Sequence, residues 1–170
     1  MSLMPDVQDL VTLARGAVVA EAHAVAALAA QFDASLVAVA EALLRCQGHV
    51  LVTGAGTSHA VAQRLAHLLS CSGTPALCLN AADSLHGGSG AIRAGDLLYV
   101  ISKGGRSAEI NALVAIARQR GATVVAQTEA SDAPLGQMAD LILQVVAPAD
   151  VDPFGMVATG SSLVNAAAGD

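Results

Sequence analysis

The chain has 170 residues, of which 54% are hydrophobic and 13% are charged, and its formal net charge is −6. The acidic balance argues against nucleic acid or an anionic membrane as a general partner. So small a charged fraction covers the surface of an isolated monomer poorly, and we therefore expect part of the surface to be buried in a homodimer or homotetramer.

The length fits a single domain spanning residues 1–170. The N-terminus lacks the basic start and apolar stretch of a secretory signal. Charged residues such as Glu21 interrupt the longest apolar runs, so we expect no transmembrane helix. The cysteines Cys46, Cys71 and Cys78 form no C-x-x-C pair, and we predict a cytoplasmic protein with reduced cysteines.

Residues 1–47 predict two helices. The first runs from Asp6 to about Ala30, and the second runs from Ala34 to Cys46 with Asp33 as its N-cap. The apolar positions on one face of the first helix are Val7, Leu10, Val11, Ala14, Val18, Ala22, Val25 and Leu28. Further apolar residues widen this face beyond what one sheet needs, which favours packing against a partner subunit. A DNA-reading element is disfavoured, because residues 1–48 carry only two basic side chains.

The stretch from His49 to Leu69 predicts a buried strand, a glycine turn and a helix. The apolar run Val50–Val52 suits a strand that is buried on both faces. The turn G-A-G-T-S at residues 54–58 lets the chain bend sharply with its backbone open to a ligand. Thr57 and Ser58 stand at the start of the helix, where their side-chain oxygens are expected to cap free N–H groups.

A helix N-terminus with open amides and hydroxyls is a ready site for an anion. The dinucleotide fingerprint needs a third glycine where this chain has His59, and the nucleotide P-loop needs a Gly-Lys-Ser/Thr run that the sequence lacks. This turn alone therefore leaves a purely structural strand–helix connection open.

The same pattern occurs a second time. The strand Leu97–Ile101 leads into S-K-G-G-R-S at residues 102–107, and a helix follows through Ile110 and Leu113. If the two strands are parallel neighbours, both turns lie at one sheet edge, where such folds bind ligands. Two hydroxyl-rich turns suit a phosphate monoester better than an extended dinucleotide. The same hydroxyls can also serve as helix caps without a ligand.

The rest of the chain alternates between strand and helix. The further strands expected are residues 75–79, 122–127 and 141–146, the further helices are 134–138 and 156–168, and a polar loop reaches Gly90. Five strands with helical crossovers predict an α/β fold, a doubly wound five-stranded parallel sheet in the flavodoxin-like order 2-1-3-4-5. Helices cover both faces of the core at residues 48–170, and residues 1–47 form an N-terminal helical extension.

These motifs resemble the SIS (sugar isomerase) domain, a phosphosugar-binding family. G-A-G-T-S is similar to the first family loop, and I-S-K-G-G-R-S-A-E-I is similar to the second, usually written S-x-S-G-E-S/T. Within the family, Asp83–Gly87 matches the E-x-x-H-G segment of arabinose 5-phosphate isomerases, and Pro153–Gly155 matches their P-L-G. The resemblance implies a sugar phosphate as ligand and aldose–ketose isomerisation as the reaction.

The candidate phosphate-binding residues are Gly56, Thr57, Ser58, Ser102, Lys103, Gly104, Arg106 and Ser107. The serines match hydroxyl positions of the family loops. Lys103 and Arg106 place two cations in one glycine turn, which adds attraction for a phosphate, although a solvated loop tip is the alternative for Lys103. His59 begins a helix beside the first turn and is expected to touch a sugar hydroxyl.

Isomerisation needs a base that moves a proton between C1 and C2, and help with ring opening. His86 is the leading candidate because it matches the histidine of the isomerase segment. Asp83 and Asp150 or Asp152 are secondary candidates. The other histidines show no metal-ligand spacing, so we expect no metal and no cofactor.

The chain departs from the isomerase pattern in three places. Thr57 stands where the family loop has a lysine, Gly104 replaces a serine, and Arg106 stands where the family has a glutamate. The segment that follows the domain in those isomerases is also expected to be absent. A non-catalytic phosphosugar sensor or regulatory subunit is therefore the alternative. A flavin or nucleotide binder is disfavoured, because no aromatic residue lies near the turns to stack on a flavin.

Overall fold

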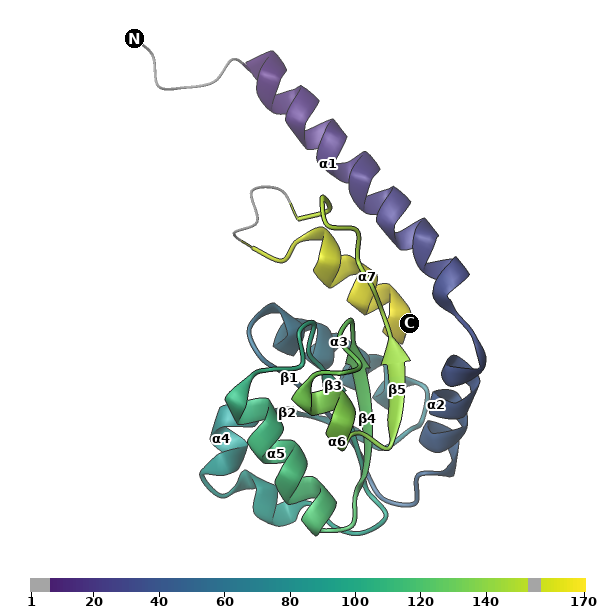
Figure 1. The fold of residues 1–170 in the computed structure, drawn as a ribbon, viewed down its shortest axis with the longest axis vertical. Helices are drawn as coiled ribbons and strands as arrows, with labels where there is room; N and C mark the ends of the chain where they lie inside the picture. The colour runs from purple at the N-terminus through teal and green to yellow at the C-terminus, as the bar shows by residue number, and fades with distance from the viewer. Residues whose placement is uncertain (1–6, 153–156) are drawn as a thin grey trace.

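A five-stranded parallel sheet forms the centre of the computed structural model, which describes residues 7–152 and 157–170 (Figure 1). The strands are β1 (Val50–Gly54), β2 (Ala76–Asn80), β3 (Leu97–Ile101), β4 (Thr123–Thr128) and β5 (Leu141–Gln144). Their order is β2-β1-β3-β4-β5, which confirms the predicted doubly wound topology. β1 pairs with both β2 and β3, so the two strands that carry the glycine turns are direct neighbours.

Helices cover both faces of this sheet. One face packs against α3 (Thr57–Cys71) and α7 (Gly160–Gly169), and the other packs against α5 (Ala108–Gln119) and α6 (Pro134–Met138). Alternate residues of β3 point into the two hydrophobic cores of the domain. Tyr99 lies in the core beneath α3 and α7, and Leu98 and Val100 lie in the core beneath α5 and α6. Every residue of β1 and β3 is buried, as the unbroken apolar runs predicted.

The N-terminal extension consists of α1 (Val7–Leu28), the short η1 (Ala29–Gln31) and α2 (Ala34–Arg45). Asp33 caps α2 as predicted, because its carboxylate accepts a hydrogen bond from the Ser35 amide at 2.7 Å. α1 packs against α7 through its C-terminal half, and its N-terminal half projects beyond the sheet domain (Figure 1).

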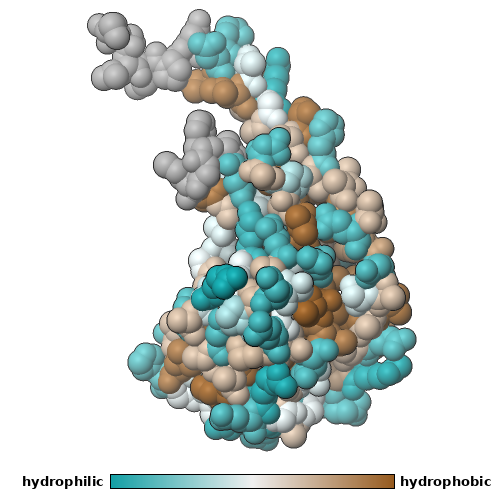
Figure 2. Space-filling model, viewed as in Figure 1, coloured by the Kyte–Doolittle hydropathy of each residue, from teal (hydrophilic) through white to brown (hydrophobic). Residues whose placement is uncertain are grey.

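Much of the apolar surface of α1 is exposed. Leu13 and Val18 are 61% and 65% exposed, whereas Ala24 and Leu28 are buried. Apolar residues recur along this helix in the space-filling view (Figure 2). A groove of about 710 Å³ lies between α1, α3 and α7, lined by residues that include Val18, Val25 and Leu163. This helix thus presents the wide apolar face that the sequence predicted.

Among the described residues, the stretch Gln8–Gln31 is long and apolar enough to cross a membrane by length and composition alone. Only 11% of its most apolar window is buried within this chain. A helix that packs against another subunit has the same properties. The expectation that no membrane takes part therefore stays a prediction.

Two segments differ from their prediction. The expected loop after β2 is partly helical, with α4 (Ala81–Leu85) and η2 (Gly88–Ala91), because the Asn80 side chain caps α4 and α4 packs against α5. α7 begins at Gly160, later than predicted, and the expected start at Met156 lies outside the described residues.

Candidate functional site

The first glycine turn lies at the carboxyl end of β1. Gly54 is buried against the first turn of α3, and a side chain there would come within 2.6 Å of the Ser58 carbonyl group, so only glycine fits. The N-cap of α3 is Gly56, with a φ of 58° and no side-chain cap. The expectation that Thr57 and Ser58 cap this helix is therefore wrong, because the backbone itself closes the turn. Their hydroxyls are left for other partners.

The second turn lies at the carboxyl end of β3. Ser102 is buried, and its amide donates to the Gln127 carbonyl oxygen at 3.1 Å. Gly105 adopts a φ of 62° and turns its carbonyl inward, where it accepts from the Leu135 amide at 3.1 Å. Ser107 is the N-cap of α5 but makes no side-chain cap bond. The Ser107 hydroxyl thus stands free of the helix that it begins.

These two turns lie side by side, because Gly54 of β1 pairs with Ile101 of β3. Each turn leads directly into a helix whose start carries hydroxyl groups, because Thr57 and Ser58 are the first residues of α3 and Ser107 is the N-cap of α5. Two helix N-termini and their hydroxyls thus share one edge of the sheet. Such an arrangement favours a compact anion.

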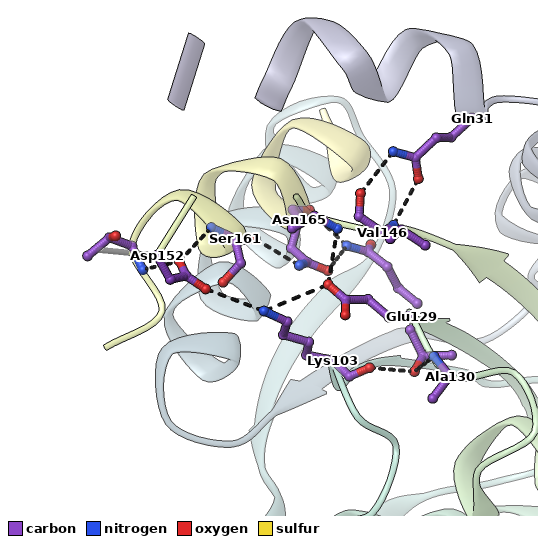
Figure 3. A network of polar contacts seen from close by, with 12 residues as sticks. Gln31, Lys103, Glu129, Ala130, Val146, Asp152, Ser161 and Asn165 are labelled. Carbon is purple, nitrogen blue, oxygen red and sulfur yellow. Dashed lines mark hydrogen bonds and ion pairs between the residues drawn. The ribbon is translucent and has the colours of Figure 1, made fainter. Parts of the chain in front are cut away.

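Lys103 lies in the second turn, and its ammonium group lies between two carboxylates (Figure 3). The Lys103 Nζ is 3.3 Å from Asp152 Oδ2 and 3.8 Å from Glu129 Oε1. The Lys103 side chain is 45% exposed, so the cluster stays open to solvent on one side. The charge predicted to attract a phosphate is therefore shared with two neighbouring carboxylates.

Asp152 joins this cluster to the start of α7. Its Oδ1 accepts hydrogen bonds from the amides of Thr159 and Ser161, both at 2.9 Å (Figure 3). Burial alone would raise the pKa of Asp152, but the hydrogen bonds from Ser161, Lys103 and Thr159 outweigh it and leave the pKa below its ordinary value. Asp152 is thus held ionised, as a cap of α7 and a partner of Lys103.

Glu129 follows β4 directly and was not among the predicted site residues. Its amide donates to the Lys103 carbonyl oxygen at 3.0 Å, and its Oε1 accepts from the Ala147 amide at 3.1 Å. The signal that points to Glu129 was present in the sequence, since a polar side chain after a buried strand lies at the ligand-binding edge of a parallel sheet. Glu129 belongs to no family motif, unlike His86 after the second strand, and so its place in the sequence drew no prediction.

A chain of buried hydrogen bonds joins β3, β4 and α7 near the charged cluster. The Tyr99 hydroxyl donates to Gln127 Oε1 at 2.8 Å, and Gln127 Nε2 donates to the Asn165 carbonyl oxygen and Oδ1 at 2.8 and 2.9 Å. Burial raises the pKa of Tyr99, so its hydroxyl stays protonated as the donor. These bonds fix β3, β4 and α7 relative to one another, and Lys103, Glu129 and Asp152 lie in the segments next to these three elements.

The candidate catalytic residues do not form one cluster within the chain. His86 is exposed at the C-terminal end of α4, and Asp83 is exposed on the same helix. Asp150 is exposed in the segment after β5. Because β2 and β5 are the two edge strands, His86 and Asp150 approach the site from opposite sides.

His59 lies near the first turn but its ring faces β2. The His59 Nδ1 is 3.8 Å from the Sγ of Cys78, and burial raises the pKa of that thiol. Gly56, Gly104 and Arg106 are exposed. Within residues 7–152 and 157–170, no group of three or more His, Cys, Asp or Glu side chains is placed to hold a metal ion.

Comparison with known proteins shows which protein family this chain is similar to. The SIS domain model matches residues 43–168. Arabinose 5-phosphate isomerase KdsD of Pseudomonas aeruginosa is 30% identical over 162 residues, which cover 95% of this chain and 50% of that protein. Arabinose 5-phosphate isomerase KpsF of Escherichia coli is matched with the same identity and coverage. The chain thus spans about half the length of the curated relatives it matches.

Two solved structures share nearly the whole fold. A Listeria monocytogenes protein, named as a candidate sugar-phosphate isomerase, aligns with a TM-score of 0.93 and 31% identity over 98% of this chain and 87% of that one. A protein of Escherichia coli CFT073, solved in complex with A5P, aligns with a TM-score of 0.92 and 26% identity over 98% of this chain and 88% of that one.

Proposed function

Because the chain belongs to the SIS domain family, we propose that it binds a sugar phosphate at the two glycine turns and isomerises it between aldose and ketose. The observation that carries the proposal is the pairing of β1 with β3, which sets two hydroxyl-bearing helix N-termini side by side. The names of the relatives, arabinose 5-phosphate isomerases and a complex with A5P, support arabinose 5-phosphate as the first substrate to test.

The phosphate would lie between the starts of α3 and α5. The hydroxyls of Thr57, Ser58, Ser102 and Ser107 and the backbone amides of Gly56 and Gly104 are the proposed donors to its oxygens. Hydrogen bonds to a charged group are stronger than those between neutral groups. Arg106, exposed in the same turn, adds a cation that draws the phosphate in.

His86 is the proposed acid or base that opens the sugar ring, with Asp83 and Asp150 as further candidates. An imidazole can both donate and accept a proton through its two ring nitrogens, which suits a general acid or base. In the single chain His86 is exposed and follows an edge strand, so a bound sugar must extend from the turns toward β2 for His86 to reach it. His59 remains a proposed contact to a sugar hydroxyl.

The experiment follows deuterium incorporation at C2 of arabinose 5-phosphate in D₂O. His86→Ala should slow turnover by about 10²–10⁴-fold, the usual effect of removing a positioned acid or base. The variant should still be stabilised by the sugar phosphate, because the phosphate is bound elsewhere. Turnover that survives this change would remove His86 from the mechanism.

A non-catalytic phosphosugar sensor is the second candidate. It is favoured by the three departures from the isomerase loops, Thr57, Gly104 and Arg106. In that case sugar phosphates bind tightly and no deuterium enters the sugar with any of them.

We further propose a cytoplasmic protein that forms homodimers or homotetramers through α1.

A further inference from the structure

We infer that Glu129 and Lys103 form the proton-transfer pair of this site, with Glu129 acting on the carbon-bound proton and Lys103 on the sugar oxygens. This inference rests on the proposed isomerase function and names two groups that would perform the central step. Neither belongs to the set His86, Asp83 and Asp150 that the sequence pattern suggested.

The two residues lie beside the phosphate turns. Lys103 is part of the second turn, and Glu129 follows β4, the direct neighbour of β3. Adjacent strands lie about 4.8 Å apart, so Glu129 is one strand away from the turn that would hold the phosphate. The hydrogen bond from the Glu129 amide to the Lys103 carbonyl oxygen, at 3.0 Å, fixes the two backbones to each other. In a sugar phosphate the reacting carbons are several bonds from the phosphorus, so they belong beside the phosphate turn and not on it.

Glu129 is oriented and still accessible. Its Oε1 accepts from the Ala147 amide at 3.1 Å and faces the Lys103 ammonium group at 3.8 Å, and its side chain is 24% exposed (Figure 3). A base needs a fixed carboxylate that a substrate can reach, and both conditions are met. An ion pair of this length, with Lys103 45% exposed, contributes little to folding stability.

Asp152 differs from Glu129 in its bonding. It accepts two backbone amide bonds and the Lys103 bond, and its side chain is only 14% exposed. A carboxylate with three donors is a poor proton acceptor, because protonation would break those bonds. Asp152 therefore acts as a positioning residue that holds the Lys103 ammonium group, and Glu129 is the carboxylate left for chemistry.

Glu129 and Lys103 together account for every proton that moves during the isomerisation. In the open-chain aldose, Glu129 takes the proton from C2, the C2–H electron pair forms the C1=C2 bond, and the carbonyl π pair moves to O1, which takes a proton from Lys103. The neutral Lys103 amine then takes the proton of the C2 hydroxyl as the C2=O bond forms, and C1 takes the proton held by Glu129. Both side chains regain their starting protonation, and the net change is aldose to ketose.

Glu129→Gln tests the inference in the full chain. The amide keeps the size of the side chain and an oxygen for the Ala147 amide, but it cannot take a proton. Deuterium incorporation at C2 of arabinose 5-phosphate should fall by about 10²–10⁴-fold. The rise in melting temperature produced by the same ligand should remain. Asp132→Asn is the matched control, since Asp132 is an exposed carboxylate on the loop that follows Glu129, and it should exchange at the wild-type rate.

The outcomes separate the inference from the function on which it rests. Exchange in Glu129→Gln within about threefold of wild type would overturn the inference while leaving the isomerase standing. Wild-type protein that is stabilised by arabinose 5-phosphate, ribose 5-phosphate or glucose 6-phosphate but exchanges none of them would overturn both. A second variant, Lys103→Gln, should lower kcat more than it raises KM, and a rise in KM alone would assign Lys103 to phosphate binding only.

Discussion

The Lys103 Nζ lies 3.3 Å from Asp152 Oδ2, and this contact joins the second glycine turn to the start of α7 across 49 residues of sequence. Lys103 is the only lysine of the chain. Because Asp152 Oδ1 also accepts two amides of the α7 N-terminus, one carboxylate serves both the helix and the turn. The position of the C-terminal helix and the charge of the candidate site are thereby coupled.

The first prediction concerns the stability that Asp152 provides. Asp152→Ala should lower the free energy of unfolding at neutral pH by about 1–3 kcal/mol, because two helix amides and an ammonium group lose their acceptor. Asp152→Asn should cost less, since it keeps one oxygen for the amides. Urea denaturation measures both, with Asp132→Asn as a surface control expected to lie within about 0.5 kcal/mol of wild type.

The effect of pH on the stability that Asp152 provides follows from the direction in which the pKa of Asp152 is shifted. The pKa of Asp152 in the folded chain lies below its ordinary value of 3.8, so its contribution is complete above that value and is lost as the pH falls through the lowered pKa. The difference between wild type and Asp152→Asn should therefore be constant from about pH 5 to 8 and shrink below about pH 4. A difference that grows on acidification would contradict the bonding described for Asp152.

The serines of the second turn give the next prediction. Ser102→Ala and Ser107→Ala should each weaken the binding of a sugar phosphate by about 1–3 kcal/mol, measured by calorimetry, because each removes a donor to a charged oxygen. Ser107→Ala should leave the unliganded melting temperature unchanged, since the Ser107 hydroxyl makes no cap bond. Ser131→Ala, at an exposed position in the neighbouring loop, should bind as wild type does. Unaltered binding in both turn variants would place the phosphate elsewhere.

The exposed face of α1 predicts an oligomer. Leu13→Glu and Val18→Glu place a charge at positions that are 61% and 65% exposed in the single chain, and each should shift a dimer or tetramer toward monomer. Light scattering at micromolar concentration reads this shift directly. Leu77→Glu, at a similarly exposed position on β2, should leave the assembly intact. A wild-type chain that is monomeric in the same experiment would exclude α1 as a subunit interface.

The sheet could be predicted from sequence because its signals are local. Runs such as Leu97–Ile101 are apolar throughout, and the topology with the fewest irregular connections was the correct one. α4 was missed because its sequence Ala81–Leu85 has no helical apolar period of its own. It forms where Asn80 supplies a cap and α5 supplies a surface. Such a helix depends on tertiary packing more than on propensity.

The candidate site was predicted only in part, for a related reason. Each turn is recognisable in itself, since Gly54 and Gly105 are required by close approach and backbone conformation. The direction of a long side chain cannot be recognised from the sequence in this way. The partners of Lys103 lie 26 and 49 residues further along the chain and are brought near only by the fold. The same holds for His59, whose ring faces Cys78 on β2.

Under the proposed function, the chain recognises a phosphate group that is held between the starts of α3 and α5. The most direct measurement compares the melting temperature of the protein with arabinose 5-phosphate and with arabinose at equal concentration. At about a hundred times its Kd, arabinose 5-phosphate should stabilise the fold by about 2.7 kcal/mol. Arabinose should leave the melting temperature unchanged, and the double variant Ser102→Ala, Ser107→Ala should lose most of the response to the phosphate. Equal shifts from arabinose and its 5-phosphate, or a full response in the double variant, would contradict phosphate recognition at the two turns.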